Sequence, residues 1–314
     1  MRAVKIKSYA KVNLTLEIVG EENGYHALDS LVASVDLFDL ISLKKRKDGL
    51  NFVRMHGMDS ESIPPEENNA WKAADAFVKK FGTTGADITI YKNIPMGSGL
   101  GGSSADTAGV LNGMAKLYGV EDRFDELKEI ADRLGSDTGY MLKGGFARMQ
   151  GRGTSVTPLP IRERLYFLLI CPKESVSTKA CYRAFDKRKG GAYPEKTGEN
   201  TEKCIRALLD GDQNEAGRYL TNDLYAPAAS LSSEVKKAYE AACGFSPLGA
   251  VMTGSGSAVL AMFENEEFCR WAKSRYKGKA RTLVVKTVLP EKKGWRTPFV
   301  LSDEERGIAE SKEG

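Results

Sequence analysis

The fold of this chain is decided by residues 95–106, which read Pro95-Met96-Gly97-Ser98-Gly99-Leu100-Gly101-Gly102-Ser103-Ser104-Ala105-Asp106. Glycine has no Cβ, so this backbone can adopt positive φ and approach a ligand closely. A helical pattern of apolar residues follows the stretch. The first N–H groups of a helix have no partner within it and attract anions. We therefore interpret the stretch as a phosphate-binding loop rather than an ordinary glycine-rich surface turn.

Three better-known nucleotide motifs do not fit this loop. A P-loop needs a lysine directly after its glycines, and none is present. Gly97, Gly99 and Gly102 have the spacing of the dinucleotide fingerprint, but the acidic residues that follow, Glu121 and Asp122, fall at the entrance to another helix. The HRD and DFG segments of protein kinases are also missing. The loop therefore predicts a nucleotide site of another type.

The residues around the loop predict mixed secondary structure. Alternating apolar residues predict strands at 12–18, 31–35, 40–43 and 86–91, with Lys11 and Asn13 on one face of the first. Apolar residues at helical spacing predict helices at 71–81, 108–118 and 124–134. Strands and helices do not alternate regularly, so the pattern favours an α+β fold over a doubly wound parallel sheet.

Prolines and charges at 157–164 indicate a domain boundary. We expect an N-terminal domain at 1–160, a C-terminal domain at 161–289 and a polar tail at 290–314. Residues 186–203 are rich in Lys, Glu, Gly and Thr and are predicted to form an exposed loop.

The amino-acid composition excludes or disfavours several classes of protein. The 314 residues are 41% hydrophobic and 28% charged, with a net charge of +4, which is typical of a globular protein and a weak indication of nucleic-acid binding. No apolar run approaches the ~20 residues of a membrane span. Five dispersed cysteines and two histidines make a Cys/His zinc site an unfavourable interpretation and suit a reducing compartment. We expect a cytoplasmic enzyme.

Five segments, in order along the chain, resemble the GHMP kinase superfamily: Tyr9–Leu14; Asn23–Leu28; the glycine loop; Leu134–Asp137 with Gly144–Ala147 and Gly151–Gly153; and Ser177–Lys179 with Asn222–Leu224 and Met252–Ser257. Within it, they are most similar to the kinases of 4-diphosphocytidyl-2-C-methyl-D-erythritol. The chain departs from their usual pattern at Ala27, Ser103, Ala105 and Thr138–Tyr140.

The resemblance implies a two-domain fold, with a ribosomal protein S5 domain 2-like N-terminal domain, a ferredoxin-like C-terminal domain and the active site between them. It implies a kinase of non-mevalonate isoprenoid (terpenoid) precursor biosynthesis, which transfers the γ-phosphoryl group of ATP to the 2-hydroxyl of this substrate. Mg²⁺ would be held mostly by the phosphates. The partner is then a small molecule with a cytidine diphosphate group, not a nucleic acid or a membrane.

The resemblance also assigns candidate residues. Asp137 would be the catalytic base, and Lys11 would keep it ionised and stabilise charge in transfer. Asn13 would bind the substrate diol, while Tyr25, His26 and, with less support, Tyr182 would bind the cytosine. ATP would contact Lys92, Asn68 and the loop from Pro95 to Ser104. Taken alone, Asp137 is typical of a turn, Lys11 of an exposed strand position and Tyr182 of a helix core face.

Two alternatives remain open at this point. A different GHMP kinase would act on a mevalonate derivative, homoserine or a sugar, although the Gly24-Tyr25-His26 segment disfavours acceptors that have no pyrimidine. A non-catalytic nucleotide- or RNA-binding protein is weakly permitted by the pI of 8.6. The presence of both Lys11 and Asp137 speaks against it.

Overall fold

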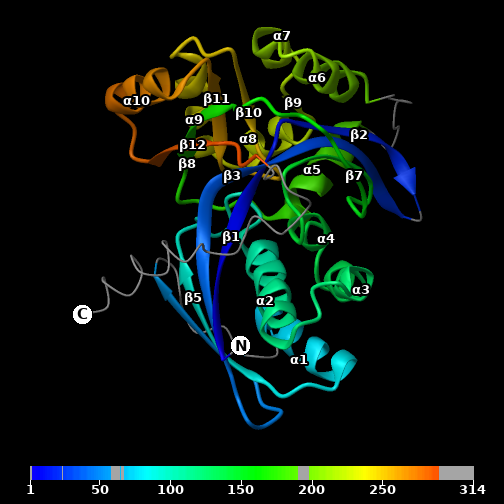
Figure 1. The fold of residues 1–314 in the computed structure, drawn as a ribbon. Coiled ribbons are helices and arrows are strands. Elements are labelled where there is room, and N and C mark those ends of the chain that lie inside the picture. Colours follow the sequence, from blue (N-terminus) through cyan, green and yellow to red (C-terminus); the bar gives the residue numbers. More distant parts are fainter. Residues whose placement is uncertain (1, 23, 58–63, 65–66, 190–197, 290–314) are drawn as a thin grey trace.

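The computed structural model describes residues 2–22, 24–57, 64, 67–189 and 198–289, and these form two β-sheets with helices packed on them (Figure 1). Within these residues, the larger sheet has eight strands: β1 (Ala3–Asn13), β2 (Thr15–Glu22), β3 (Tyr25–Lys45), β4 (Phe52–Gly57), β5 (Ala86–Lys92), β6 (Phe146–Gly151), β7 (Ser155–Pro158) and β9 (Thr221–Asn222). The smaller sheet has the order β10-β11-β8-β12, from Gly249–Met252, Val259–Phe263, Tyr166–Cys171 and Arg281–Lys286.

Strand β3 is the centre of the larger sheet, because β1, β2, β5 and β6 all pair with it in antiparallel register. The prediction of separate strands at 31–35 and 40–43 is wrong, since β3 runs through both without a break. Asp36 and Asp39 interrupt the apolar pattern there. Asp39 is nevertheless fully buried, because partners elsewhere in the chain satisfy its carboxylate.

The helices of the first half pack on the larger sheet and on one another: α1 (Asn69–Phe81), α2 (Gly102–Tyr118), α3 (Phe124–Leu134) and α4 (Thr138–Met141). Those of the second half are α5 (Thr178–Lys189), α6 (Glu199–Leu209), α7 (Gln213–Arg218), α8 (Tyr225–Leu231), α9 (Ser233–Cys243) and α10 (Glu266–Arg275). Helices α9 and α10 pack on the smaller sheet, and α6 packs on β2 and β3. The predicted helices at 71–81, 108–118 and 124–134 are thus confirmed.

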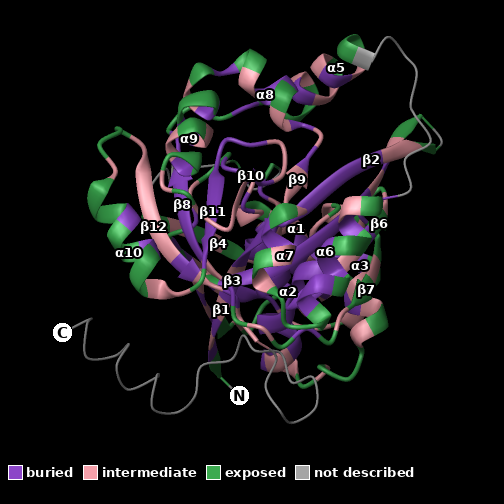
Figure 2. Ribbon diagram, turned by 90° about the horizontal axis from the view of Figure 1, so that it is seen from above, coloured by how far each residue is buried: buried purple, intermediate pink, exposed green. Residues whose placement is uncertain are grey.

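Helix α2 is largely buried, and Figure 2 shows it mostly in the colour of buried residues. It crosses β1 and β3 at close range. A Cβ at Gly109 would lie 2.5 Å from Ile41 Cδ1, so a glycine is needed where the helix touches the sheet. This contact fixes the helix start, and with it the glycine loop, against the sheet.

Some predictions about the second half need correction. The stretch 186–203 is not one exposed loop, because α5 continues to Lys189 and α6 starts at Glu199; residues 190–197 and the tail at 290–314 lie outside the described residues. The domain boundary near 160 stays a prediction. It falls between β7 and β8, which belong to different sheets, although β9 crosses back to pair with β2. No described helix is long and apolar enough to span a membrane.

Candidate active site

The glycine loop joins the end of β5 to the start of α2 and lies against both halves of the chain. Gly99 and Gly101 have φ values of 78° and 73°, where side chains are strained. A Cβ at Gly99 would lie 2.2 Å from the carbonyl oxygen of Thr253, and one at Gly101 would lie 2.3 Å from Met141 Cε. Gly101 is also the N-cap of α2 and offers no side chain to cap it. The first amides of α2 are therefore available to an anion.

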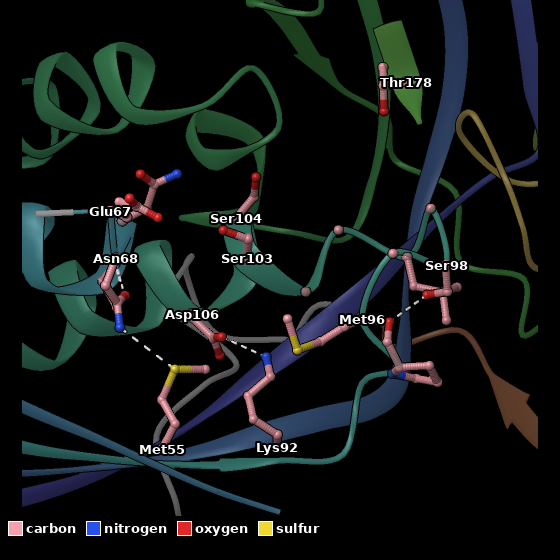
Figure 3. Close-up of a pocket in the computed structure, with 18 residues that line it drawn as sticks. Met55, Glu67, Asn68, Lys92, Met96, Ser98, Ser103, Ser104, Asp106 and Thr178 are labelled. Atoms are coloured by element: carbon pink, nitrogen blue, oxygen red, sulfur yellow. Dashed lines mark hydrogen bonds and ion pairs between the residues drawn. The ribbon is translucent and has the colours of Figure 1, made fainter. Parts of the chain in front are cut away.

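One face of the loop closes a pocket of about 350 Å³, which Figure 3 shows in close-up. The loop from Pro95 to Ser104 forms one wall, and Met55, Glu67 and Asn68 come from the opposite side. The Asn68 side chain caps α1 by accepting from the Ala70 amide, so only part of its polar surface is available to a ligand. The predicted loop residues thus line a pocket, their contact with ATP stays a prediction, and the sequence analysis did not identify Met55 and Glu67.

The other face of the loop closes a second pocket, of about 340 Å³, lined by Lys11, Asp137 and Tyr182 among others. Four residues line both pockets, namely Gly99, Gly101, Ser104 and Thr178. The loop is thus the partition between two adjoining cavities. A phosphate chain held by the loop in the first would have its end close to groups in the second.

Lys11 and Asp137 meet at this partition. The Lys11 ammonium lies 3.1 Å from the Asp137 carboxylate and donates to Asn13 Oδ1 at 2.7 Å. Its side chain is 6% exposed and that of Asp137 is 30% exposed. Asp137 lies at the N-terminus of α4, directly after the turn that ends α3. The predicted orientation of Lys11 and Asn13 on one strand face is confirmed by their hydrogen bond.

Asn13 connects this pair to the second half of the chain. Its Oδ1 also accepts from the Gly254 amide at 3.0 Å, and its backbone N–H donates to Thr253 Oγ1 at 2.9 Å. Its Nδ2 donates to Ser30 Oγ at 2.9 Å. Asn13 lines the second pocket, yet most of its hydrogen-bonding capacity is used within the protein. This arrangement points to positioning of Lys11, and contact with a substrate diol stays a prediction.

An aromatic group lies at one side of the second pocket. Tyr182 of α5 lines it, and the His26 ring packs on Tyr182 with 4.7 Å between ring centroids. His26 Nε2 is 2.7 Å from an oxygen of Asp186. Tyr25 is 53% exposed, and the Arg152 guanidinium, which also lines the pocket, lies 3.6 Å from the centre of its ring. The sequence analysis did not identify Asp186 as the partner of His26 or the contact of Arg152 with the Tyr25 ring.

Lys92 lies at the base of the first pocket within a buried charge cluster. Its ammonium donates to Asp39 and, at 2.5 Å, to Asp106 Oδ2. Figure 3 shows Lys92 and Asp106 facing one another. Burial alone would lower the pKa of Lys92, but the two carboxylates outweigh burial and raise it, so the ammonium stays charged. Lys92 lines the pocket, but its charge is already shared with two carboxylates, and its contact with ATP stays a prediction.

Comparison with known proteins bears on this arrangement. Residues 68–147 match the GHMP kinases N terminal domain, and residues 204–267 match the GHMP kinases C terminal domain. The chain is 34% identical over 285 residues to the 4-diphosphocytidyl-2-C-methyl-D-erythritol kinase of Caldicellulosiruptor saccharolyticus, covering 90% of this chain and 96% of that protein. This chain belongs to the GHMP kinase superfamily. The kinase of the same description from Carboxydothermus hydrogenoformans is 38% identical, over 82% of this chain and 87% of its own.

Solved structures agree with this GHMP kinase assignment. A 4-(cytidine 5'-diphospho)-2C-methyl-D-erythritol kinase has a TM-score of 0.73 at 29% identity, with 90% of this chain and 98% of that chain covered. A homoserine kinase from Cytophaga hutchinsonii has a TM-score of 0.72 at 20% identity, covering 92% and 95%, and shows the shared fold alone. The predicted α+β GHMP kinase fold, which the structure builds on two sheets, is therefore confirmed.

The two matched GHMP regions divide the site between them. The first contains the glycine loop and Asp137, and the second contains Thr253 and Gly254. Lys11 and Asn13 precede the first region, and Tyr182 lies between the two. The site is therefore assembled from segments far apart in sequence, and the hydrogen bond from the Asn13 amide to Thr253 spans 240 positions.

Proposed function

We propose that this GHMP kinase transfers the γ-phosphoryl group of ATP to the 2-hydroxyl of 4-diphosphocytidyl-2-C-methyl-D-erythritol, a step of non-mevalonate isoprenoid precursor biosynthesis. The observation that carries the proposal is the shared partition between the two pockets. Gly99, Gly101 and Ser104 face both cavities, so a triphosphate on one side can present its end to an alcohol on the other. The relatives from Caldicellulosiruptor saccharolyticus and Carboxydothermus hydrogenoformans, 34% and 38% identical to this chain, are kinases of this acceptor.

Asp137 acts as the general base in this proposal. Its carboxylate is the partly exposed member of the pair with Lys11, so it can reach the hydroxyl of an alcohol in the second pocket. A positioned general base contributes about 10² to 10⁴ in rate. Lys11 pairs with the Asp137 carboxylate at 3.1 Å and places a positive charge where negative charge develops during transfer. Asn13 holds the Lys11 ammonium in place through its 2.7 Å hydrogen bond.

The glycine loop binds the triphosphate by its backbone. Amides at the start of α2 face the first pocket, and the helix dipole favours negative charge there. Mg²⁺ would be held mainly by the phosphates of the nucleotide and would supply the neutralisation of their charge that phosphoryl transfer needs. The described residues contain no group of three or more His, Cys, Asp or Glu side chains placed to hold a metal ion.

The aromatic group provides a binding surface for a pyrimidine. Tyr182 lines the acceptor pocket beside His26, and Arg152, which also lines it, contacts the ring of Tyr25. Burial raises the pKa of Tyr182, so its phenol stays neutral and can stack on a base. Flat rings with polar edges suit cytosine and offer little to mevalonate, homoserine or a sugar. A cytoplasmic location, with this small molecule as partner, completes the proposal.

The direct test is production of ADP with a panel of acceptors. We expect turnover with 4-diphosphocytidyl-2-C-methyl-D-erythritol and little with the same alcohol lacking cytidine. Mevalonate, homoserine and galactose serve as the other acceptors. Higher turnover with one of these would contradict the proposed acceptor but retain a GHMP kinase activity. Absence of ADP with every alcohol, together with retained nucleotide binding, would indicate a non-catalytic protein.

A further inference from the structure

The buried cluster beneath the nucleotide pocket has one more negative group than positive groups. The side chains of Lys92, Asp39 and Asp106 are 3%, 0% and 6% exposed, so water does not screen their charges. One ammonium faces two carboxylates. If both carboxylates were ionised, the cluster would hold an unbalanced negative charge in a poorly solvated place, which is costly. A proton on one carboxylate removes that cost.

The hydrogen bonds show which carboxylate takes the proton. Asp39 accepts from the Asn93 and Ile94 amides through Oδ1 and from Lys92 through Oδ2, so both of its oxygens are already occupied as acceptors. Asp106 accepts from Lys92 through Oδ2. Its Oδ1 is buried and has no hydrogen-bond partner among the described residues. Protonation of Asp106 would therefore remove the unbalanced charge of the cluster, and its Oδ1 is free to carry the proton.

The cluster lies directly against the phosphate-binding start of α2. Lys92 and Asp106 both line the nucleotide pocket. A Cβ at Gly102, the first residue of α2, would lie 3.7 Å from Lys92 Nζ. Ionisation of Asp106 would thus add a negative charge beneath the amides that attract the triphosphate. Because the protein interior screens charge weakly, that added charge opposes binding of an anion.

We propose that Asp106 is held protonated beneath the nucleotide pocket and that nucleotide binding drives proton uptake by the fraction of Asp106 that is ionised. The inference rests on the nucleotide pocket of the proposed function but not on the identity of the acceptor. Coupling of this kind is reciprocal: if the neutral form binds nucleotide more tightly, bound nucleotide must favour the neutral form by the same factor.

Few other charges face Asp106 from the sheet. Lys92 of β5 and Asp39 of β3 are in contact with it. Lys11 of β1 is directed to Asp137 instead. Burial, followed by the charge of Asp39 against the opposing attraction of Lys92, raises the pKa of Asp106 to about 8. Half of the molecules would thus carry the proton at a pH at which the enzyme can be assayed.

The helices packed on α2 add no charge to the cluster. α4 contains no charged residue. Glu67, ahead of α1, lines the pocket, as does the neutral Asn69, which accepts from Lys72. Three ion pairs engage other charged residues of α1 and α3, namely Lys79 with Asp75, Lys80 with Glu129 and Lys128 with Asp132. Glu67 is the remaining titratable group in this pocket, so the experiment must separate it from Asp106.

The test measures protons taken up when the Mg²⁺ complex of a non-hydrolysable imido analogue of ATP binds, by calorimetry at pH 8 in two buffers of different ionisation enthalpy. If the ionised form binds about tenfold more weakly, bound nucleotide raises the pKa of Asp106 by about one unit. Its protonated fraction then rises from about half to about nine-tenths, an uptake of roughly 0.4 proton.

Asp106→Asn, a neutral isostere, should abolish this uptake, whereas Asp125→Asn, the same change at an exposed site on α3, should keep it. The wild type should lose its uptake at pH 6.5, where Asp106 is already protonated. If Asp106→Asn does not fold, the comparison of wild-type uptake at pH 8 and pH 6.5 still tests the proposal. Equal uptake in the wild type and Asp106→Asn, or undiminished uptake at pH 6.5, would overturn the inference. Absence of binding at pH 6.5 would instead contradict the proposed nucleotide pocket.

Discussion

Gly101→Ala tests whether the glycine loop sets the position of Lys11. Gly101 has a φ of 73°. A Cβ at this position would lie 2.3 Å from Met141 Cε and 3.1 Å from Lys11 Cγ. The end of Met141 can move aside. The Lys11 stem has less freedom, because its ammonium is bound to Asp137 and Asn13 and its backbone N–H donates to Leu100 at 3.0 Å. The added methyl group must therefore displace the loop or Lys11.

The same helix offers a matched control. Gly119 ends α2 with a φ of 74°, and a Cβ there would meet nothing within 4 Å. Both alanine variants thus carry the same backbone strain, about 1–2 kcal/mol, but only Gly101→Ala adds a steric overlap. Overpacking costs roughly a further 1–3 kcal/mol. We expect urea denaturation to show this further loss of unfolding free energy for Gly101→Ala relative to Gly119→Ala.

Activity should separate the two variants more sharply. A displacement of about 1 Å in a positioned catalytic group can cost ~100-fold in rate. ADP production should therefore fall by roughly that factor in Gly101→Ala and stay within about twofold of wild type in Gly119→Ala, which lies at the far end of the helix. If Gly101→Ala loses the expected stability but keeps full turnover, the contact between loop and Lys11 does not set the catalytic geometry.

Three further outcomes are expected. Asp137→Asn should lower kcat by at least ~100-fold while nucleotide binding by calorimetry is retained, and near-normal turnover would remove Asp137 as the base. Tyr182→Ala should raise KM for the cytidine substrate more than KM for ATP, and equal changes would contradict its role in the acceptor pocket. Because folding raises the pKa of Asp106 to about 8 from an ordinary 3.8, the folded state binds the extra proton between these values. Unfolding free energy should then fall as pH rises towards 8, by at most about 1.4 kcal/mol per pH unit from this group, and a urea series should find the slope absent in Asp106→Asn and unchanged in Asp125→Asn.

The sequence was sufficient to predict the loop because its chemistry is local. Glycines and serines that open an apolar helix already imply free amides facing a ligand. The alternation around Lys11 and Asn13 likewise predicted a shared strand face, and their hydrogen bond confirms it. These features depend on backbone conformation and on periodicity, both of which a short window of sequence contains.

Long-range pairing was beyond that reasoning. Asp39 reads as a polar break in an apolar strand, and only the fold shows that Lys92 and two amides satisfy it. Asp186 fell in a stretch predicted to be an exposed loop, yet α5 places it against His26. In each case the partner lies 50 or more positions away, and a single sequence offers no signal for such a contact.

The structure also explains why the loop can serve two cavities without collapsing into either. Its β5 end is held by Asp39, which accepts the Asn93 and Ile94 amides just before the loop begins. Its helical end is held by Asp106 through Lys92. Its middle rests on the second half of the chain, where the Ala258 amide donates to the carbonyl of Ser98 at 3.0 Å. A loop fixed at both ends and in the middle can leave its remaining amides unsatisfied, because the surrounding contacts maintain the geometry that an anion would otherwise have to impose. The charge cluster thus helps to fix the conformation of the loop at both of its ends. The protonation state of Asp106 and the affinity for nucleotide should therefore change together.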